Sequence, residues 1–205
     1  GSTGSDITCV SFGPHMKLTS SNGGVLATDD LEMMERASLL RNHGMVKEDE
    51  SLPYIYDVVE IGNKYTMSPI EAAFNTAFIT HQDMAIERQQ ELAARYNERL
   101  KGTHHITLPE VHRDHAFFNY IIKVDKNRDG FARDLLARGI ETGLHYIPLH
   151  LMSYYKNKYG LRINDFPVAL RNYQQILSLP IYASMTDKEV DYVCDTIIEL
   201  AKNRV

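Results

Sequence analysis

The amino-acid sequence predicts an α/β fold in two parts, with residues 1–101 as the end of a larger domain with its bridging helices and residues 102–205 as a small α+β domain. Short apolar runs bounded by Gly, Asp or Ser predict strands, and longer segments with apolar residues at helical spacing predict helices. The chain has 205 residues and is 43% hydrophobic, which is enough to bury one or two cores.

The first part begins with two short apolar stretches, 7–12 and 24–28, which predict an antiparallel pair of strands. Apolar residues then recur at helical spacing over 30–42, and Gly44 supplies the stop for this helix. A charged stretch at 47–50 follows and is typical of a solvated connection between elements.

The clearest helix start in the chain lies at Ser68. Ser68 is a suitable N-cap, Pro69 suits the first helical position, and Glu71 completes a capping box. The sequence therefore predicts a helix over 68–80. A second helix is predicted over 82–100, where charged residues lie opposite the apolar ones.

The second part shows a different order of elements. The sequence predicts a strand at 117–124, a helix at 130–137 and a return strand at 140–146, in a βαβ-like arrangement. Two closing helices are predicted at 166–177 and 187–202, and a capping box opens the second of them.

Charge and composition exclude several classes of partner. With 22 basic and 27 acidic residues the net charge is −5 and no basic run is present, so capture of nucleic acid is not expected. No apolar run is long enough to cross a bilayer and no signal-peptide pattern opens the chain, so we expect a cytoplasmic location without membrane contact. Cys9 and Cys194 lie far apart and are both expected to be buried in a protein of a reducing compartment. The nine histidines form no metal-ligand spacing, so no metal site is expected.

Five motifs in order along the chain resemble those of one protein family, the DegT/DnrJ/EryC1/StrS sugar aminotransferases. They occupy residues 11–24, 40–44, 62–68, 145–150 and 177–180. The resemblance covers essentially the whole chain. It implies the C-terminal part of a fold-type-I transferase that uses pyridoxal 5′-phosphate (PLP) or its amino form, pyridoxamine 5′-phosphate (PMP). It further implies homodimer-type pairing with shared active sites and a nucleotide-linked keto-sugar as substrate.

One departure from the family pattern bears directly on catalysis. The family places its Schiff-base lysine five residues after the serine of a Ser-Phe pair and seven before a Gly-Gly pair, and both counts lead here to Met16. The lysine amine serves as nucleophile toward the PLP aldehyde and as the base that moves a proton, whereas a thioether does neither. Either Met16 occupies this slot, or the loop is rearranged so that Lys17 serves. In an extended segment the side chain of Lys17 would point to the opposite face.

The resemblance implies cofactor contacts for two other residues. Ser11 aligns with a serine whose hydroxyl contacts the cofactor phosphate, although a serine at a strand end also caps its own backbone. Lys64 aligns with an Asn or Lys that reaches the phosphate of the neighbouring subunit, where a lysine adds a full positive charge. Thr66 departs from the arginine that is usual in this motif.

Three residues of the second part are candidates for substrate binding. His145, Tyr146 and His150 align with a motif that lies beside the sugar or nucleotide in relatives, and imidazole and phenol groups hydrogen-bond to hydroxyls and phosphates. In the alternative interpretation Tyr146 belongs to the core and the two histidines cap the end of a strand.

The family takes three further parts of its site from sequence that precedes residue 1: an acidic residue opposite the pyridine nitrogen, an aromatic residue on the ring and a backbone phosphate cup. We therefore expect this chain to be an enzyme only when an N-terminal half completes it, as a separate chain or as the rest of the same polypeptide. The leading hypothesis is a PLP-dependent nucleotide-sugar aminotransferase that moves an amino group from an amino acid such as glutamate to a keto-sugar. Some family members with histidine in the lysine slot are PMP-dependent keto-sugar dehydratases, and His15 lies next to that slot. A catalytically silent subunit that supports an active partner is the third hypothesis.

Overall fold

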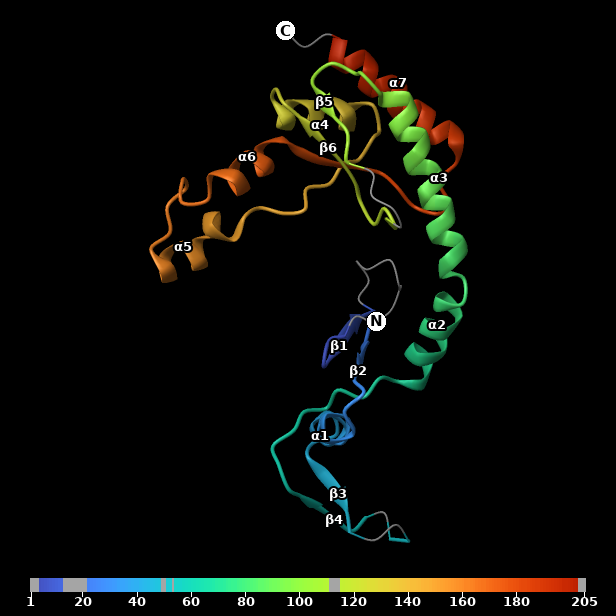
Figure 1. Ribbon diagram of the computed structural model, residues 1–205, viewed down its shortest axis with the longest axis vertical. Coiled ribbons are helices and arrows are strands. Elements are labelled where there is room, and N and C mark those ends of the chain that lie inside the picture. Colours follow the sequence, from blue (N-terminus) through green and yellow to red (C-terminus); the bar gives the residue numbers. More distant parts are fainter. Residues whose placement is uncertain (1–3, 13–21, 49–50, 53, 111–114, 203–205) are drawn as a thin grey trace. The chain divides into compact units, whose positions relative to one another are not determined.

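The chain divides into two compact units, Gly1–Gln82 and Asp83–Val205, which are described separately below (Figure 1). The computed structural model describes residues 4–12, 22–48, 51–52, 54–110 and 115–202. The long helix that begins at Gln82 clusters with the second unit. The assignment of residues 1–101 to a PLP-binding domain stays a prediction.

The first unit opens with the predicted pair of strands. β1, Thr8–Ser11, and β2, Gly24–Ala27, are antiparallel, with Thr8 opposite Ala27 and Ser11 opposite Gly24. The backbone amide of Phe12 donates to the carbonyl of Gly23 at 2.9 Å and extends the ladder by one bond. Cys9 on β1 is exposed, so its predicted burial is wrong: alternate residues of a strand face opposite sides, and its side is uncovered.

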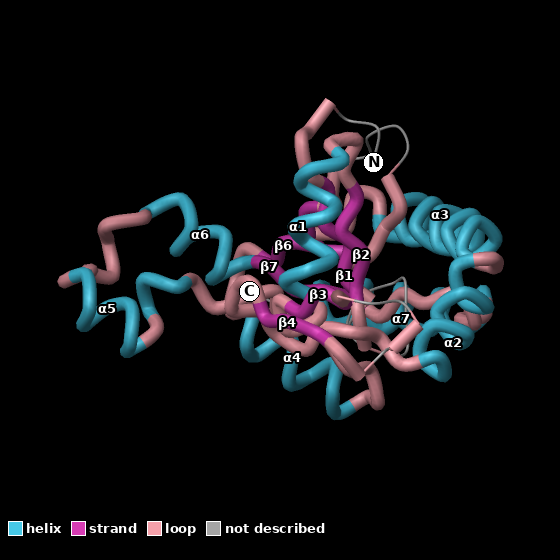
Figure 2. Tube along the Cα trace, turned by 90° about the horizontal axis from the view of Figure 1, so that it is seen from below, coloured by secondary structure: helices cyan, strands magenta, loops and turns pink. Residues whose placement is uncertain are grey.

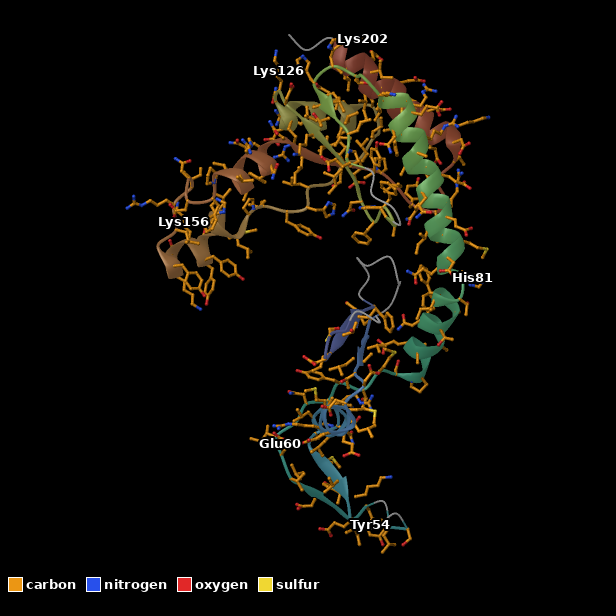
Figure 3. All side chains as sticks on the ribbon, viewed as in Figure 1. Tyr54, Glu60, His81, Lys126, Lys156 and Lys202 are labelled. Atoms are coloured by element: carbon orange, nitrogen blue, oxygen red, sulfur yellow. The ribbon has the colours of Figure 1, made fainter. Side chains whose placement is uncertain are left out.

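Helix α1, Leu31–Arg41, confirms the predicted helix. Asp30 caps it by accepting from the amide of Met33 at 3.1 Å. The chain then forms a hairpin that the sequence did not predict, made of β3, Met45–Lys47, and β4, Tyr56–Val58. Strands of three residues are too short to show a periodic pattern. Figure 3 shows Tyr54 at the exposed tip of this hairpin.

Helix α2, Pro69–Ile79, begins as the sequence predicts. The amide of Glu71 donates to the Ser68 hydroxyl at 3.2 Å, and the amide of Ser68 donates to the Glu71 carboxylate at 3.0 Å. This reciprocal capping box satisfies two amide groups that a helix start otherwise leaves unpaired. It fixes where the preceding turn ends and the helix begins.

The second unit contains a three-stranded antiparallel sheet in the order β5-β6-β7. Its strands are β5, Ile106–Thr107, β6, Tyr120–Val124, and β7, Ile176–Leu179. Two predictions are therefore wrong. Residues 140–146 form no strand and meet the sheet through the bridge between Gly143 and Ser178 of β7, whereas pairing with β6, as the βαβ-like order predicts, is excluded because β6 already pairs on its two edges with β5 and β7. The predicted helix over 166–177 ends at Gln175, and its last two residues belong instead to β7, since the backbone turns extended at Ile176.

Five helices and a short 3₁₀ segment accompany this sheet. They are α3, Gln82–Leu100, α4, Arg128–Ala137, the 3₁₀ segment Leu149–Leu151, α5, Ser153–Tyr159, α6, Pro167–Gln175, and α7, Asp187–Lys202. Figures 1 and 2 show α5 and α6 extending away from the sheet as an arm. The predicted capping box of α7 is present, with the Glu189 amide donating to the Thr186 hydroxyl at 3.3 Å. Helices α3 and α7 lie along one another in the same unit.

The core of the second unit is built from α3, α4, α7 and one face of the sheet. Tyr96 on α3 stacks on Tyr120 on β6 with ring centroids 4.8 Å apart, and both side chains are fully buried. The hydroxyl of Tyr96 donates to the carbonyl of Pro180 at 2.9 Å, and that of Tyr120 donates to Asn97 Oδ1 at 2.6 Å. Each buried hydroxyl therefore has a partner. Burial raises the pKa of the Cys194 thiol to about 12, which confirms Cys194 as an inert core residue.

A row of ion pairs joins α3 to α7. The Arg95 guanidinium donates two hydrogen bonds to the Asp191 carboxylate, Nε to Oδ1 at 2.9 Å and an Nη to Oδ2 at 2.6 Å. Arg99 and Arg88 extend the row toward the two ends of α7 through their own aspartate partners. This arrangement fixes the register of two helices whose apolar faces already pack together.

We expect the Arg95–Asp191 pair to give folding stability a dependence on pH. Hydrogen bonds from Arg95 hold the pKa of Asp191 below its ordinary value, so ionised Asp191 stabilises the fold above the ordinary pKa of a carboxyl group. That contribution is lost as the pH falls through the lowered pKa. Asp191→Asn should therefore lower the Tm at neutral pH, with a difference from wild type that shrinks below about pH 3.

The control for this prediction is Glu87→Gln, at an exposed position on α3, which should leave the pH profile of the Tm unchanged. Thermal unfolding followed by circular dichroism between pH 2 and 7 measures both variants. A Tm difference for Asp191→Asn that stays constant over this range would assign the effect to packing instead of charge.

Among the described residues, no helix has the length and apolar content needed to span a membrane.

Candidate functional site

The turn that carries Lys64 is fastened to the end of α1 by backbone hydrogen bonds. The amide of Asn63 donates to the carbonyl of Leu40 at 2.8 Å, and the amide of Tyr65 donates to the carbonyl of Arg41 at 2.9 Å. Asn42 and Lys64 form an antiparallel bridge between these bonds. The backbone of Lys64 is therefore fixed from both sides, while its side chain is exposed.

This attachment requires glycine at two positions. Gly44 is buried and has a φ of +69°, and a Cβ there would lie 1.7 Å from the backbone carbonyl oxygen of Glu60. A Cβ at Gly62 would lie 2.4 Å from the amide nitrogen of Gly44. Because these contacts are with backbone atoms, no side-chain rotation relieves them. Gly44 does end α1, as predicted, but its second role in packing against the Lys64 turn was missed.

Ser11 lies at the end of β1, where it pairs with Gly24 of β2. The next residue, Phe12, is buried with 6% of its surface exposed and anchors the start of the loop that follows. Gly23, at the other end of this loop, has a φ of +118°, and its Cα approaches the side chain of Met67. Both ends of the loop are thus held. Met16 and Lys17, the two candidates for the lysine slot, lie outside the described residues, as does His15.

A cavity of 840 Å³ opens beside the end of this loop, within the first unit. Its wall is largely apolar, and Arg41 and Glu71 are the charged residues that line it. The other lining residues come from β1, β2, α1 and the turn before α2: Val10, Asn22, Gly23, Gly24, Val25, Leu26, Met34, Ala37, Ser38, Leu40, Tyr65, Thr66 and Met67.

Asn75 on α2 is a polar residue that the sequence did not single out. It is buried, with 2% of its surface exposed, and its Nδ2 donates to the carbonyl of Asn22 at 3.3 Å. Its Oδ1 has no hydrogen-bond partner among the described residues. Its position as a polar residue in a mostly apolar part of the predicted helix is the signal by which the sequence could have identified it. Its bond to Asn22 fastens the end of the Ser11–Gly24 motif to α2.

In the second unit, His145 and Tyr146 lie together. Their rings meet edge to face with centroids 4.9 Å apart, and Tyr146 is 72% exposed. The interpretation of Tyr146 as a core residue is therefore wrong. His145 is half-buried, and its Nδ1 lies 2.8 Å from the hydroxyl oxygen of Ser178 on β7. The sequence placed Ser178 in a family motif without giving it a role.

His150 is separated from this pair by the residues that lead into the 3₁₀ segment. It is buried, with 5% of its surface exposed, and its ring centroid is 5.0 Å from that of Phe166. Within the part of the chain that the structure describes, its Nε2 has no hydrogen-bond partner. Among the predicted residues, the structure thus places Ser11 and Lys64 in the first unit and the three aromatic candidates in the second. No group of His, Cys, Asp and Glu suited to a metal ion occurs among the residues described.

Solved structures that this chain resembles place its fold among aminotransferases. It aligns with the aminotransferase TlmJ from Streptoalloteichus hindustanus at 26% identity and a TM-score of 0.86, covering 97% of this chain and 53% of that one. It aligns with S. venezuelae DesV, solved in complex with a ketimine intermediate, at 29% identity and a TM-score of 0.84, covering 97% and 52%. These likenesses confirm the predicted fold class, part of a fold-type-I PLP-dependent transferase.

The family follows from the sequence itself. The model of the DegT/DnrJ/EryC1/StrS aminotransferase family matches residues 1–198, so the chain belongs to this family. The chain is 32% identical to the spore coat polysaccharide biosynthesis protein SpsC of Bacillus subtilis (strain 168), with 98% of this chain and 55% of SpsC covered. The uncharacterized protein MJ1066 of Methanocaldococcus jannaschii is also 32% identical, over 97% of this chain and 55% of its own length. The chain thus spans about half the length of these relatives.

Members of the family use PLP and PMP. A Streptococcus pneumoniae protein, Spr1654, that this chain resembles at 25% identity has been solved in a PMP form and in a PLP form. The donors present here suit the phosphate of either form, because a serine hydroxyl donates a hydrogen bond and a lysine ammonium supplies positive charge. Ser11 is exposed at a strand end, and Lys64 is exposed on a fixed turn.

Proposed function

We propose that this chain is the C-terminal portion of a PLP-dependent nucleotide-sugar aminotransferase. In the proposed reaction, glutamate and a keto-sugar are converted into 2-oxoglutarate and an amino-sugar, so the amino group and the carbonyl oxygen change places. Membership of the aminotransferase family over residues 1–198 carries this proposal. When bound, the cofactor supplies the carbonyl and the electron-accepting ring that this chemistry needs.

The residues of this chain have separate roles in the proposal. Ser11 and Lys64 hold the cofactor phosphate, with Lys64 reaching the site of the neighbouring subunit. His145, Tyr146 and His150 contact the hydroxyls or phosphates of the nucleotide-linked sugar, the first two from a half-buried and an exposed position and His150 from a buried one. Since the two phosphate ligands come from different subunits, the proposed active unit is a dimer.

An N-terminal half is part of the proposal, and the composition of the first unit supports it. Phe12 is the one buried apolar side chain among its described residues. A two-stranded sheet is marginal in water by itself, and β1 and β2 form such a sheet within the part described. We infer that the N-terminal half covers the apolar side chains that this unit leaves exposed. These include Val25, Leu26, Leu31, Met33, Met34, Val58, Val59, Ile61, Ile70 and Phe74.

Met16 supports a second candidate function. If a thioether occupies the lysine slot, the chain lacks the amine that acts as nucleophile and base. A PMP-dependent keto-sugar dehydratase, which releases a deoxygenated sugar without net amine transfer, fits such a slot. A silent subunit that lends Lys64 and the dimer interface to an active partner fits it as well.

The experiment combines this chain with its N-terminal half, PLP, glutamate and a nucleotide-linked keto-sugar, and follows 2-oxoglutarate and the sugar product by mass spectrometry. The aminotransferase proposal predicts equal amounts of 2-oxoglutarate and amino-sugar. Deoxygenated sugar formed together with 2-oxoglutarate and free ammonia, and without amino-sugar, would favour the dehydratase, because glutamate then only regenerates the PMP whose electrons reduce the sugar. Absence of any sugar product with a panel of keto-sugars would contradict both enzymes and leave the silent subunit.

A further inference from the structure

The surroundings of His145 indicate which nitrogen of its ring carries the proton. His145 Nδ1 and Ser178 Oγ are 2.8 Å apart, within hydrogen-bond range. Ser178 is buried, with 5% of its surface exposed, and lies in the middle of β7 opposite Ile121 of β6. Its hydroxyl is therefore held by a strand that is paired on one edge with β6 and on the other with Gly143.

Gly143 completes this arrangement. Its amide donates to the Ser178 carbonyl at 2.9 Å and its carbonyl accepts from the Ser178 amide at 2.8 Å, so the chain two residues before His145 is tied to β7. A Cβ at position 143 would lie 3.0 Å from Cε1 of the His145 ring and 3.6 Å from Cβ of Ser178. Glycine at this position thus leaves the space into which the imidazole fits.

The direction of the hydrogen bond follows from the burial of Ser178. A buried hydroxyl proton without an acceptor carries a desolvation penalty, and His145 Nδ1 is the acceptor that the structure brings within reach. If Nδ1 instead carried the proton, the Ser178 hydroxyl would accept it, and the buried hydroxyl proton would need another acceptor, which the described side chains do not supply. The hydroxyl therefore donates to Nδ1. In a neutral imidazole this arrangement puts the ring proton on Nε2.

We propose that Ser178 is a positioning residue that sets the tautomer of His145, so that the neutral ring donates a hydrogen bond through Nε2–H. The group that it recognises is an acceptor oxygen, such as a carbonyl, hydroxyl or phosphate oxygen of the substrate. Tyr146 packs edge to face against the same ring and is exposed. The identity of the substrate rests on the function proposed above, whereas the state of the ring does not. His145 in this form binds substrate and does not act as a base.

The first test reads the tautomer directly. In the full chain labelled with ¹⁵N-histidine, the shifts of Nδ1 and Nε2 report which nitrogen carries the proton, and His145→Gln identifies the signal among the nine histidines. We expect Nε2–H in the wild type. Ser178→Ala should lower the ratio of Nε2–H to Nδ1–H by about five-fold, the effect of losing one hydrogen bond. Ser178→Cys, with similar volume and a weak donor, should give an intermediate ratio.

The matched control is Ser184→Ala, at an exposed serine in the same unit, which should leave the His145 signals unchanged. A wild-type ring protonated on Nδ1 would overturn the proposal, and so would an unchanged ratio in Ser178→Ala. Either result stands whether or not the protein transfers amino groups, because no substrate is present in this measurement.

The second test uses the completed enzyme and compares two variants of His145. The amide of glutamine can donate from a position close to that of Nε2–H, so His145→Gln should retain a KM within about five-fold of wild type, whereas His145→Ala should raise it by about ten-fold or more. Equal losses in kcat for both variants would indicate a base and contradict the donor assignment. If the wild type converts no keto-sugar, the proposed function fails while the tautomer result remains.

Discussion

Replacing Met16 by lysine is expected to raise the rate of amino transfer by about 10²- to 10⁴-fold in the protein completed by its N-terminal half, the usual contribution of a positioned acid or base. The reason lies in the side-chain chemistry. Transamination needs a neutral amine at this position to bind the cofactor and to move a proton, and the thioether of Met16 provides neither function. Met16→Lys would supply both.

The spacing of two flanking motifs directs this prediction to position 16. Counting from Ser11-Phe12 and counting back from Gly23-Gly24 give the same position, and the structure holds both flanks of the loop, with Phe12 buried and Gly23 packed near Met67. Both counts therefore assign the lysine slot to Met16, and in an extended segment the side chain of Lys17 would point to the opposite face.

Lys17→Met is the matched variant for this measurement. Steady-state production of 2-oxoglutarate from glutamate is measured for wild type, Met16→Lys and Lys17→Met. We expect Lys17→Met to behave as wild type. A wild type that is already fast, together with an inactive Lys17→Met, would show that Lys17 occupies the slot. No gain in Met16→Lys would instead favour the silent subunit.

Local signals in the sequence predicted the elements that local interactions determine. The capping boxes at Ser68 and Thr186 start α2 and α7, because a cap depends on residues three positions apart. The strand pair β1–β2 and the long helix α3 were also predicted, from their apolar patterns. In each of these cases the information lies within the element or at its border.

The errors share a different cause, which is pairing between distant segments. Residues 140–146 are apolar enough for a strand, but their pairing with β7 is limited to the bridge between Gly143 and Ser178. That bridge places Ser178 against His145, and no spacing in the sequence reveals it. The contact between Gly44 and the Glu60 carbonyl is of the same kind, since it joins the end of one helix to a turn that follows a hairpin. Motifs thus located the candidate residues, whereas their partners required the structure.

Substituting Gly44 by alanine is expected to weaken both the fold of the first unit and its proposed binding of the cofactor phosphate. The left-handed backbone at φ +69° costs alanine about 1–2 kcal/mol. In addition, the new Cβ would overlap the carbonyl oxygen of Glu60, and one of the two backbones must move. We expect a total loss of at least about 2 kcal/mol of unfolding free energy, measured by denaturant unfolding of the completed protein.

Gly102→Ala separates the cost of the left-handed backbone from the cost of the overlap between the new Cβ and a neighbouring carbonyl oxygen. Gly102 has a similar φ of +74°, but no atom lies within 4 Å of its Cβ position, so its substitution tests backbone strain alone. We expect Gly102→Ala to leave PLP affinity unchanged and Gly44→Ala to lower it by about 10- to 100-fold, the range for one lost charge-assisted hydrogen bond. Lys64→Met should lower PLP affinity equally without lowering stability, because the Lys64 side chain is exposed. If Gly44→Ala destabilises the protein while PLP binds as in wild type, the Lys64 turn does not form the phosphate site, and the cofactor phosphate must be held elsewhere.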